Sequence, residues 1–556
     1  MNRVLVTNDY RTVLSMSGFD AWYHCLPPKL GIDQFRSTLP LMVKDDQHEA
    51  VIVAKEIDRT NLESISKPGV RFVFHTPYFT FDRLEHPSDA RPDLPTAVGE
   101  LVDSNAYLDP LVPVALWQEL KGRLGLATWP DHRDFVPPLN LYKVPRSKVT
   151  ETANIAHDLG ARAAQPYVEY LRASDLLKHW LSAPLDDRLS SLDRLMAQND
   201  IDAIFASTPI NIQELSGIPS TLVGEDVWAL YEREASYVYI FSRRELPWFG
   251  LPESKPLGSS PVIEIAKGNI GYEELDLTIS AFEGFDLSKV ATKPASLLLR
   301  RWREQRSWED LAFYVLGAQL TIHAIEAALA LVNESQTDGG YVTELDAYER
   351  YRDSVTNEIH EHQLPIRVRT YFTHAFAGSR SLLPSRPTEY SLEHLTSFKI
   401  DAGIEVYDYH GSLRAVSDIT RTALGTSDAM DAYHVLEQIL VEEVIPRCQP
   451  GVSGEEVFIA GADAIEPYLK GLLSYGLYPD SPVAFRDLFG RDIGHLLGKQ
   501  EPATVVFQKG NHEVFEPGMV AAAELQWPYH DFCIGVEDVF MTTESASVNL
   551  TRCNGE

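Results

Sequence analysis

Short apolar runs alternate with helical patterns along most of the chain, which is typical of an α/β protein. The run at residues 4–8 is followed by a polar turn, a short helical stretch and the pair Ser17 and Gly18. The run at residues 202–207 has the same sequel, which ends at Ser216 and Gly217. Each unit predicts a buried strand, a turn, a short helix and a stop at small residues. A duplication and a chance likeness of two α/β segments both agree with this pattern.

Further strand-like runs follow the two units, at residues 50–54 and 236–241. Between the units, residues 149–181 have helical spacing and few turn residues, which predicts a helical connector. Capping-box patterns at residues 307–310 and 343–346 predict the starts of two helices, the first of which runs to Asn333. From residue 397 onward, strand-like runs and Gly-rich turns alternate with helices.

A chain of 556 residues favours three domains over one. We place the domain boundaries near residues 185 and 290, where the pattern changes. The predicted domains are therefore an α/β domain with its helical connector at 1–184, a second α/β domain at 185–290, and a third domain at 291–556.

The composition narrows the classes of function. A net charge of −31 disfavours nucleic acid and anionic membrane surfaces, both of which attract Lys and Arg. No run approaches the ~18 apolar residues of a membrane span, and the start lacks the pattern of a signal peptide. The four cysteines lie far apart without a CxxC spacing, so we expect neither a disulfide framework nor a zinc site. We expect a cytoplasmic enzyme.

Acidic residues in apolar surroundings mark the last third of the chain. Asp401 and Asp418 lie in β-rich runs, where an acid without a function is usually kept at an edge. A turn at residues 410–412 allows the two runs to pair as a hairpin and brings both carboxylates to one face.

Three further residues belong to the same set. His495 stands between glycines, Glu524 closes an apolar strand, and Glu537 lies within another. Any one of these acids could be a solvated charge at a strand end, but four carboxylates and an imidazole together are too costly to bury as free ions. A pair of divalent cations resolves the repulsion, and this donor set suits Mn²⁺, Fe²⁺ or Co²⁺, with Zn²⁺ as another option.

The motifs around these residues resemble those of the creatinase/prolidase/aminopeptidase P family, whose catalytic domain has the pita-bread fold. The motifs are IDAG at 400–403, SDITRT at 417–422, GHLLG at 494–498, EPGMV at 516–520 followed by Glu524, and VED at 536–538. The resemblance covers roughly residues 290–545. It implies that Asp401, Asp418, His495, Glu524 and Glu537 are ligands of two metal ions, with Mn²⁺ as the first choice.

The same resemblance implies an overall architecture. The two Ser-Gly units look like two copies of the family's creatinase-type N-terminal domain, so the chain is similar to the three-domain aminopeptidases P. The fold class implied is α/β (α+β), with two creatinase-N-like domains before a pita-bread domain. A homodimer is expected by analogy with the family.

The spacing of the two aspartates departs from the family pattern. They are usually eleven residues apart, whereas Asp401 and Asp418 are seventeen apart. Six extra residues keep the parity of a hairpin, so both side chains still face the same way. Asp408 lies ten residues before Asp418, which inverts that parity, and Asp401 is therefore the preferred ligand.

Other departures concern the catalytic groups around the metals. Peptidases of the family carry a histidine in the loop before the first aspartate, but residues 382–387 contain none. A second histidine usually follows the GHLLG motif, and Gln500 stands in its place; the usual arginine two residues before the last glutamate is Gly535. The candidates to replace the histidines are His374, which lies just upstream of that loop, and then His410, His512 and His530. Taken singly, each of the four is more typical of a loop or surface position.

Three classes of function follow. The first is a metal-dependent hydrolase of the Xaa-Pro aminopeptidase or dipeptidase type. In it a metal-bound hydroxide attacks an amide carbonyl, Glu524 also shuttles a proton, and Gln500 and His374 assist. The second is a creatinase-like amidino hydrolase or a lyase, which uses the same metals with altered surroundings. The third is a non-enzymatic binding module, which is disfavoured because such modules typically lose the metal ligands. The substrate of the first two classes is a small molecule or a short peptide.

Overall fold

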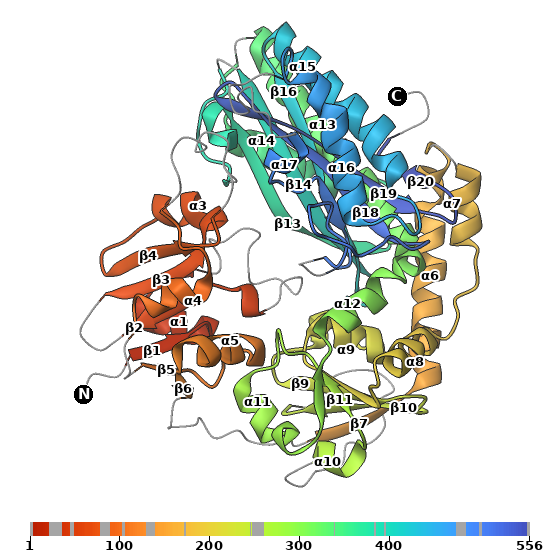
Figure 1. Cartoon of the computed structure of the whole chain (residues 1–556). Coiled ribbons are helices and arrows are strands. Elements are labelled where there is room, and N and C mark those ends of the chain that lie inside the picture. Colours follow the sequence, from red (N-terminus) through yellow and green to blue (C-terminus); the bar gives the residue numbers. More distant parts are fainter. Residues whose placement is uncertain are drawn as a thin grey trace.

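The structure of the chain, a computed structural model, has three parts that follow one another along the sequence (Figure 1). An N-terminal sheet is followed by a second sheet, and the C-terminal part holds two further sheets with long helices. The residues described are 4–21, 36–44, 49–77, 89–102, 106–128, 140–171, 174–244, 246, 261–338, 340–382, 385–393, 396–473, 485–499 and 503–552.

The first two sheets each contain six strands in matching order. The first runs β4-β3-β2-β1-β5-β6 and the second runs β7-β10-β9-β8-β11-β12. Without the edge strands β4 and β7, five strands remain in each sheet: β3-β2-β1-β5-β6 in the first and β10-β9-β8-β11-β12 in the second. These two sets have the same sequence of parallel and antiparallel pairings. The edge strands differ, because β4 is parallel to β3 whereas β7 is antiparallel to β10.

The bounds of the strands in the first sheet are β1 Val4–Thr7, β2 Leu41–Lys44, β3 Ala50–Lys55, β4 Val70–His75, β5 Ala106–Leu108 and β6 Ala127–Thr128. Those of the second are β7 Asn140–Pro145, β8 Ala203–Ala206, β9 Val227–Glu232, β10 Tyr237–Ser242, β11 Ile270–Tyr272 and β12 Thr292–Pro294. The helices of these parts are α1 Tyr10–Ser17, α3 Arg59–Ser64, α4 Leu94–Gly99, α5 Val114–Leu124, α8 Arg188–Gln198, α9 Pro209–Ser216, α10 Pro261–Ile265 and α11 Ile279–Gly284.

The two predicted stops have the same local geometry. Gly18 and Gly217 end their helices with positive φ angles of 62° and 71°, a conformation that favours glycine. Ser17 and Ser216 each donate a hydrogen bond of 2.6 Å to the carbonyl four residues earlier and accept one from the N–H two residues later. Matching strand order and matching stops favour a duplication over a chance likeness.

Helices α6 (Arg146–Val168) and α7 (Ser174–Leu181) occupy the predicted helical connector. The second sheet nevertheless takes β7 from before residue 185 and β12 from after residue 290. The strands of this sheet therefore come from both sides of the predicted boundaries, and the division into three domains stays a prediction.

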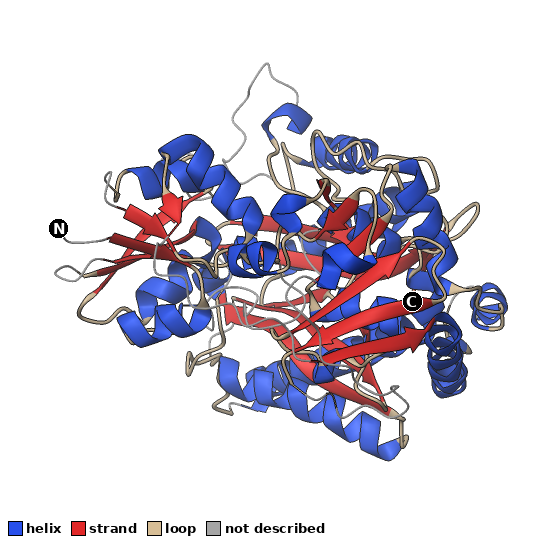
Figure 2. Cartoon of the chain, turned by 90° about the horizontal axis from the view of Figure 1, so that it is seen from below, coloured by secondary structure: helices blue, strands red, loops and turns tan. Residues whose placement is uncertain are grey.

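The C-terminal part consists of two four-stranded sheets that face each other, with helices on their outer sides (Figure 2). Helices α13 and α14 share one apolar core with the sheet of strands β13 to β16. Helices α15 and α16 share another with the sheet of strands β17 to β20. The strands are β13 Ile366–Ala377, β14 Ser397–Asp408, β15 Leu413–Val416, β16 Ile419–Leu424, β17 Gly494–Leu496, β18 Val520–Tyr529, β19 Phe532–Thr542 and β20 Ser547–Asn549. The helices are α12 Ser296–Glu304, α13 Leu311–Asp338, α14 Glu344–Glu361, α15 Ser427–Ile439, α16 Gly454–Ile465 and α17 Phe485–Leu488.

The stretch Ser307–Gln336, which includes α13 up to Gln336, is long and apolar enough to cross a membrane by length and composition alone. It is mostly buried within the protein, and its apolar residues pack against α14, β14 and α6, as expected of a core helix. The sequence argument counted consecutive apolar residues, whereas this stretch is interrupted by polar residues such as Gln319 and Thr321.

The two predicted capping boxes have different outcomes. The one at 343–346 is confirmed, because Thr343 and Asp346 exchange the expected hydrogen bonds at the start of α14. The one at 307–310 is wrong. These residues form a turn of 3₁₀ helix without a side-chain cap, and Asp310 forms ion pairs with Lys499 and Arg414 instead.

The six extra residues between the two aspartates lengthen the β14–β15 hairpin, whose turn at residues 409–412 includes the predicted residues 410–412. This turn contacts the second part of the chain. The Gly411 carbonyl accepts a hydrogen bond of 2.9 Å from the Thr221 hydroxyl, and the Leu413 backbone exchanges two with the Gln213 amide. Gly411 has a φ of 92°, and a Cβ there would lie 2.4 Å from Thr221 Oγ1, so only glycine fits.

Beside this contact, eight buried charged side chains form one connected set, which we call the interdomain charge cluster. Each is at most 6% exposed, and the four cations and four anions balance. The members are Arg188, Glu214, Arg306, Glu309, Asp310, Asp408, Arg414 and Lys499, joined by eight ion pairs. Burial opposes the ionisation of Glu214, but Lys499, Arg188 and Arg306 outweigh it and hold the pKa of that carboxyl well below its usual value. The cluster joins the second sheet's helices to the C-terminal part.

Candidate metal centre

The structure brings the five predicted ligands together where the two C-terminal sheets meet. Asp401 lies on β14, Asp418 in the break between β15 and β16, His495 on β17, Glu524 on β18 and Glu537 on β19. One ligand atom each of Asp418, His495 and Glu537 lies within 4.8 Å of the others.

Strand register explains why the remaining two acids join this group. Glu524 is directly opposite Glu537 in the β18–β19 ladder, and directly opposed residues of an antiparallel pair project from the same face. Asp401 is opposite Thr420, which lies two residues after Asp418 and therefore on the same face. The parity argument from the sequence agrees with this arrangement. The assignment of the five residues as ligands stays a prediction.

Charged residues of the same motifs hold the two sheets together. Arg421 of β16 donates a hydrogen bond of 2.6 Å to the carbonyl of Glu537 and one of 2.7 Å to the carboxylate of Asp538. Arg552 also pairs with Asp538, so this buried acid is held by two guanidinium groups. Arg421 and Asp538 thereby fix the backbone that carries Glu537, although neither faces the other ligands.

Burial without counter-ions is unfavourable for these acids. Burial, together with the neighbouring carboxylates, raises the pKa of Asp418 to about 7, although His495 opposes the rise. Burial and the other three acids of the set raise the pKa of Glu537 well above its usual value, and burial also raises those of Asp401 and Asp492. Such a set fits divalent cations, because positive charge in the middle relieves the repulsion that the carboxylates otherwise share.

The ring of His495 is oriented for the same purpose. Its Nδ1 lies 3.0 Å from the carbonyl oxygen of Leu496, which assigns the proton to Nδ1. Nε2 then keeps its lone pair and lies 3.6 Å from Asp418 Oδ2. A backbone carbonyl that holds one nitrogen while the other faces a metal is a common arrangement for ligating histidines.

The raised pKa of Asp418 predicts a pH-dependent stability of the metal-free protein. Between pH 3.8 and about 7 the folded state keeps a proton that the unfolded state loses, so the free energy of unfolding falls as pH rises through that window. An Asp418→Asn variant cannot ionise there. We expect its stability relative to wild type to rise by a few kcal/mol from pH 5 to pH 8, in urea unfolding with chelator present. A difference between the two proteins that is the same at both pH values contradicts this.

His374 is the candidate histidine that reaches this face of the sheet. It lies directly opposite Asp401 in the β13–β14 ladder. Its Nδ1 lies 3.3 Å from the Ser385 carbonyl, and burial, with the charge of Lys399, lowers its pKa to about 3. His410, His512 and His530 are exposed and do not share the buried face. Gln500 lies outside the described residues.

Three residues near the ligands were missed in the sequence. Lys399 and Gln526 lie two residues from Asp401 and Glu524, and Thr420 lies two residues after Asp418, so all three share faces with ligands. The signal was a charged, amide or hydroxyl side chain inside an apolar strand, two residues from a predicted ligand. Glu524 itself accepts a hydrogen bond of 3.4 Å from Arg491, which leaves its other oxygen available.

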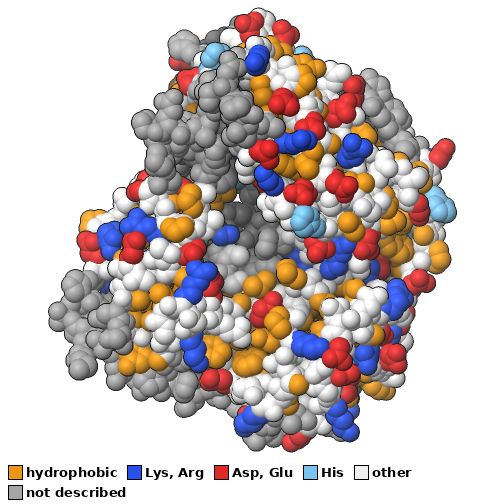
Figure 3. Space-filling view, in the orientation of Figure 1, with side chains coloured by type: hydrophobic (Ala, Val, Ile, Leu, Met, Phe, Trp, Pro, Cys, Tyr) orange, Lys and Arg blue, Asp and Glu red, His pale blue; other side chains and the backbone are white. Residues whose placement is uncertain are grey.

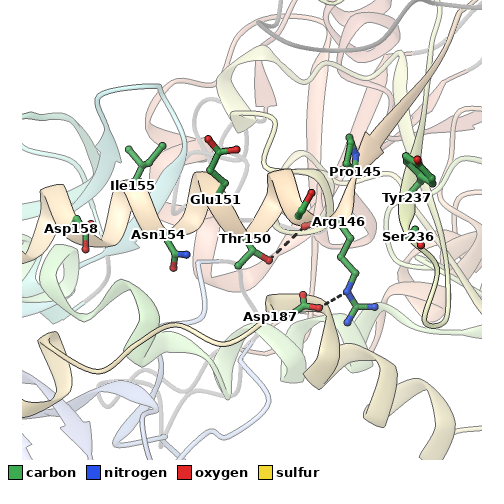
Figure 4. Close-up of a pocket in the computed structure, with 11 residues that line it drawn as sticks. Pro145, Arg146, Thr150, Glu151, Asn154, Ile155, Asp158, Asp187, Ser236 and Tyr237 are labelled. Carbon is green, nitrogen blue, oxygen red and sulfur yellow. Dashed lines mark hydrogen bonds and ion pairs between the residues drawn. The ribbon is translucent and has the colours of Figure 1, made fainter.

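A separate pocket of about 810 Å³ lies along the first turns of α6 (Figure 4). Arg146, Asp187 and Tyr237 line it, and none of the predicted ligands does. On the face shown in Figure 3, acidic and basic side chains are interspersed, so the net negative charge is not gathered into one patch there.

Comparison with known proteins shows a family match in the C-terminal part of the chain. Residues 317–544 match the model of the Metallopeptidase family M24. The chain is 23% identical over 386 residues to a Xaa-Pro dipeptidase of Pyrococcus furiosus, which covers 67% of this chain and 99% of the relative. It is 24% identical over 388 residues to an uncharacterized peptidase of Staphylococcus epidermidis, over 66% of this chain and 99% of the relative.

Similar solved structures include the prolidase from Pyrococcus furiosus, at a TM-score of 0.49 and 19% identity over 65% of this chain and 99% of that chain. Another is the X-Pro aminopeptidase from Thermotoga maritima, at a TM-score of 0.47 and 15% identity over 65% of this chain and 97% of that chain.

Proposed function

We propose that this chain, a metal-dependent hydrolase whose residues 317–544 form a pita-bread domain of metallopeptidase family M24, cleaves short Xaa-Pro peptides with two divalent metal ions. The family match confirms the resemblance seen in the motifs. The observation that carries the finer proposal is the convergence of four carboxylates and His495 where the two C-terminal sheets meet, with Asp418, His495 and Glu537 in one close group. The name of one relative, a Xaa-Pro dipeptidase, supports the substrate class, and that of the other, an uncharacterized peptidase, supports peptide cleavage.

The five residues would hold the ions through carboxylate oxygens and the Nε2 of His495. When bound, the ions supply Lewis acidity for a substrate carbonyl and lower the pKa of water. The donor set suits Mn²⁺ first, then Fe²⁺, Co²⁺ or Zn²⁺.

The chain's own residues supply the remaining functions. Glu524, whose Oε2 accepts only a long hydrogen bond of 3.4 Å from Arg491, is proposed to accept and return a proton beside its ligand role, as a general base. His374 is neutral at pH 7 because of its low pKa, so it orients a substrate rather than carrying a proton. Gln500 is proposed as a neutral hydrogen-bond partner of the substrate.

The substrate class is tested with purified protein that is reloaded with Mn²⁺. We expect turnover of Gly-Pro and of Xaa-Pro-Xaa peptides, and none of creatine-like amidino compounds or sulfonium compounds. Metal loading with turnover of the second group alone would replace the peptidase proposal with the amidino hydrolase or lyase. Cleavage of the dipeptide in the presence of excess chelator would contradict the metal requirement.

Substitution of His374 tests the proposed orienting role. We expect His374→Ala to lower kcat/KM for a Xaa-Pro peptide on the order of 10²-fold, as for other preorganised polar groups, with an unchanged pH profile between pH 6 and 8. His434, whose side chain is 70% exposed, provides the control His434→Ala, which should match wild type. Gln500→His should raise turnover if that position faces the substrate. Robust wild-type cleavage that is indifferent to both substitutions would refute these assignments.

We further propose a cytoplasmic homodimer without nucleic-acid or membrane partners. The net charge of −31 supports the exclusion of polyanions. The dimer rests on family analogy, and the solution mass tests it.

A further inference from the structure

A buried lysine lies beside the metal centre without a carboxylate partner. Lys399 is 5% exposed, and no carboxylate oxygen of the described residues lies within ion-pair distance of its Nζ. Its ammonium donates a hydrogen bond of 2.6 Å to Gln526 Oε1 and lies 5.1 Å from the centre of the Phe376 ring. Burying an ammonium beside only a neutral amide and an aromatic ring costs free energy. A buried group of this kind therefore suggests a role beyond packing.

The partner of Lys399 passes the interaction on to the metal ligands. Gln526 donates from Nε2 to Thr420 Oγ1 at 3.0 Å, with a longer contact of 3.5 Å to Asp401 Oδ2. Thr420 in turn donates 2.9 Å to Glu537 Oε2. Lys399, Gln526 and Thr420 therefore form a hydrogen-bonded series that ends on two of the predicted ligands.

Lys399 decides which groups donate and which accept along this hydrogen-bonded series. An ammonium has donors only, so the amide oxygen of Gln526 must face Lys399 and its NH₂ must face the site. With the NH₂ directed at Thr420 Oγ1, the hydroxyl hydrogen is free to point at Glu537. Both ligand carboxylates then act as acceptors, with lone pairs left for cations.

Gly535, two residues before Glu537, packs closely against this hydrogen-bonded series. A Cβ at Gly535 would lie 2.6 Å from Gln526 Oε1, 2.6 Å from Thr420 Cγ2 and 2.9 Å from Lys399 Cδ. A side chain at residue 535 would displace all three, so glycine at this position leaves room for Lys399, Gln526 and Thr420 to meet.

We propose that Lys399 is a positioning residue of the metal centre, which acts through Gln526 and Thr420 to orient the carboxylates of Asp401 and Glu537 toward the ions. This inference rests on the proposed metal-dependent function. It assigns to Lys399 and Gln526 the role of outer partners, whose loss typically costs about 10–100-fold in metal affinity.

The test is calorimetric titration of the metal-free protein with Mn²⁺. Lys399→Met keeps the length of the side chain but removes the donor. Gln526→Glu keeps an acceptor for Lys399 but cannot donate to Thr420 or Asp401. The control is Lys509→Met, a lysine that is 60% exposed in the same part of the chain.

We expect both site variants to bind Mn²⁺ about 10–100-fold more weakly than wild type, and the control to bind equally. The Gln526→Glu result is the sharper one, because an added negative charge would by itself strengthen cation binding. Wild-type affinity in that variant overturns the inference while leaving the proposed function intact. A wild type that takes up no Mn²⁺ contradicts the proposed function, and the inference with it.

Discussion

Replacing Asp418 or Glu537 by alanine is expected to lower turnover on the order of 10³-fold or more and to remove at least one metal ion per chain. Both side chains lie within 4.8 Å of His495 in the group that could hold a metal. A metal ion supplies several kcal/mol of transition-state stabilisation, and each 1.36 kcal/mol is a factor of ten in rate. Elemental analysis of the purified variants gives the metal content, and a steady-state assay on Gly-Pro gives the turnover.

The matched control for this experiment is Glu513→Ala, a glutamate that is 60% exposed in the same part of the chain. It should retain both metal content and turnover. Variants at 418 and 537 that keep full metal content and full activity would show that these acids are not ligands.

Replacing Lys499 by methionine is expected to destabilise the protein by about 3–5 kcal/mol, the usual result of breaking one partner of a buried pair. Lys499 lies between Glu214 and Asp310 in the interdomain charge cluster, and its loss leaves two buried carboxylates short of a cation. The free energy of unfolding is measured by urea denaturation of metal-free protein, so that metal binding does not contribute.

Lys509→Met is the control, because Lys509 forms an exposed pair with Asp487. Exposed pairs contribute about 0–1 kcal/mol, so the control should stay close to wild type. Equal effects of the two substitutions would mean that burial adds nothing to the cluster's stability.

The parts of the fold that the sequence predicted well depend on neighbours in the chain. Gly18 and Gly217 end their helices because the local backbone needs a positive φ, and Thr343 caps α14 through a residue three positions away. The shared face of Asp401 and Asp418 likewise follows from strand parity and the position of the hairpin turn.

The parts that it missed depend on residues far apart in the chain. The pattern at 307–310 resembles a capping box, but its Asp310 pairs with Lys499, which lies 189 residues later in the chain. The added length of the β14–β15 hairpin has no local cause, because its turn is held by Thr221 and Gln213 of the second part. Neither pairing leaves a signal within one segment.

The candidate site divides in the same way. The four acids and His495 stood out in the sequence because their residue types are unusual in apolar strands. Lys399 could not be placed from sequence alone, since its meaning depends on Gln526 of another sheet. Gly535 stood out in the sequence as a departure from the motif, but its close approach to Lys399 of β14 did not.

The central claim is that this chain is a peptidase with two metal ions at one site, and a titration of activity against metal tests it most directly. Metal-free protein is mixed with increasing equivalents of Mn²⁺, and the initial rate of Gly-Pro hydrolysis is measured at each step. We predict no cleavage without metal and a rate that rises until about two equivalents per chain are bound. Gly-Pro hydrolysis that proceeds without metal, or metal binding at this stoichiometry with no peptide cleaved, would contradict the claim.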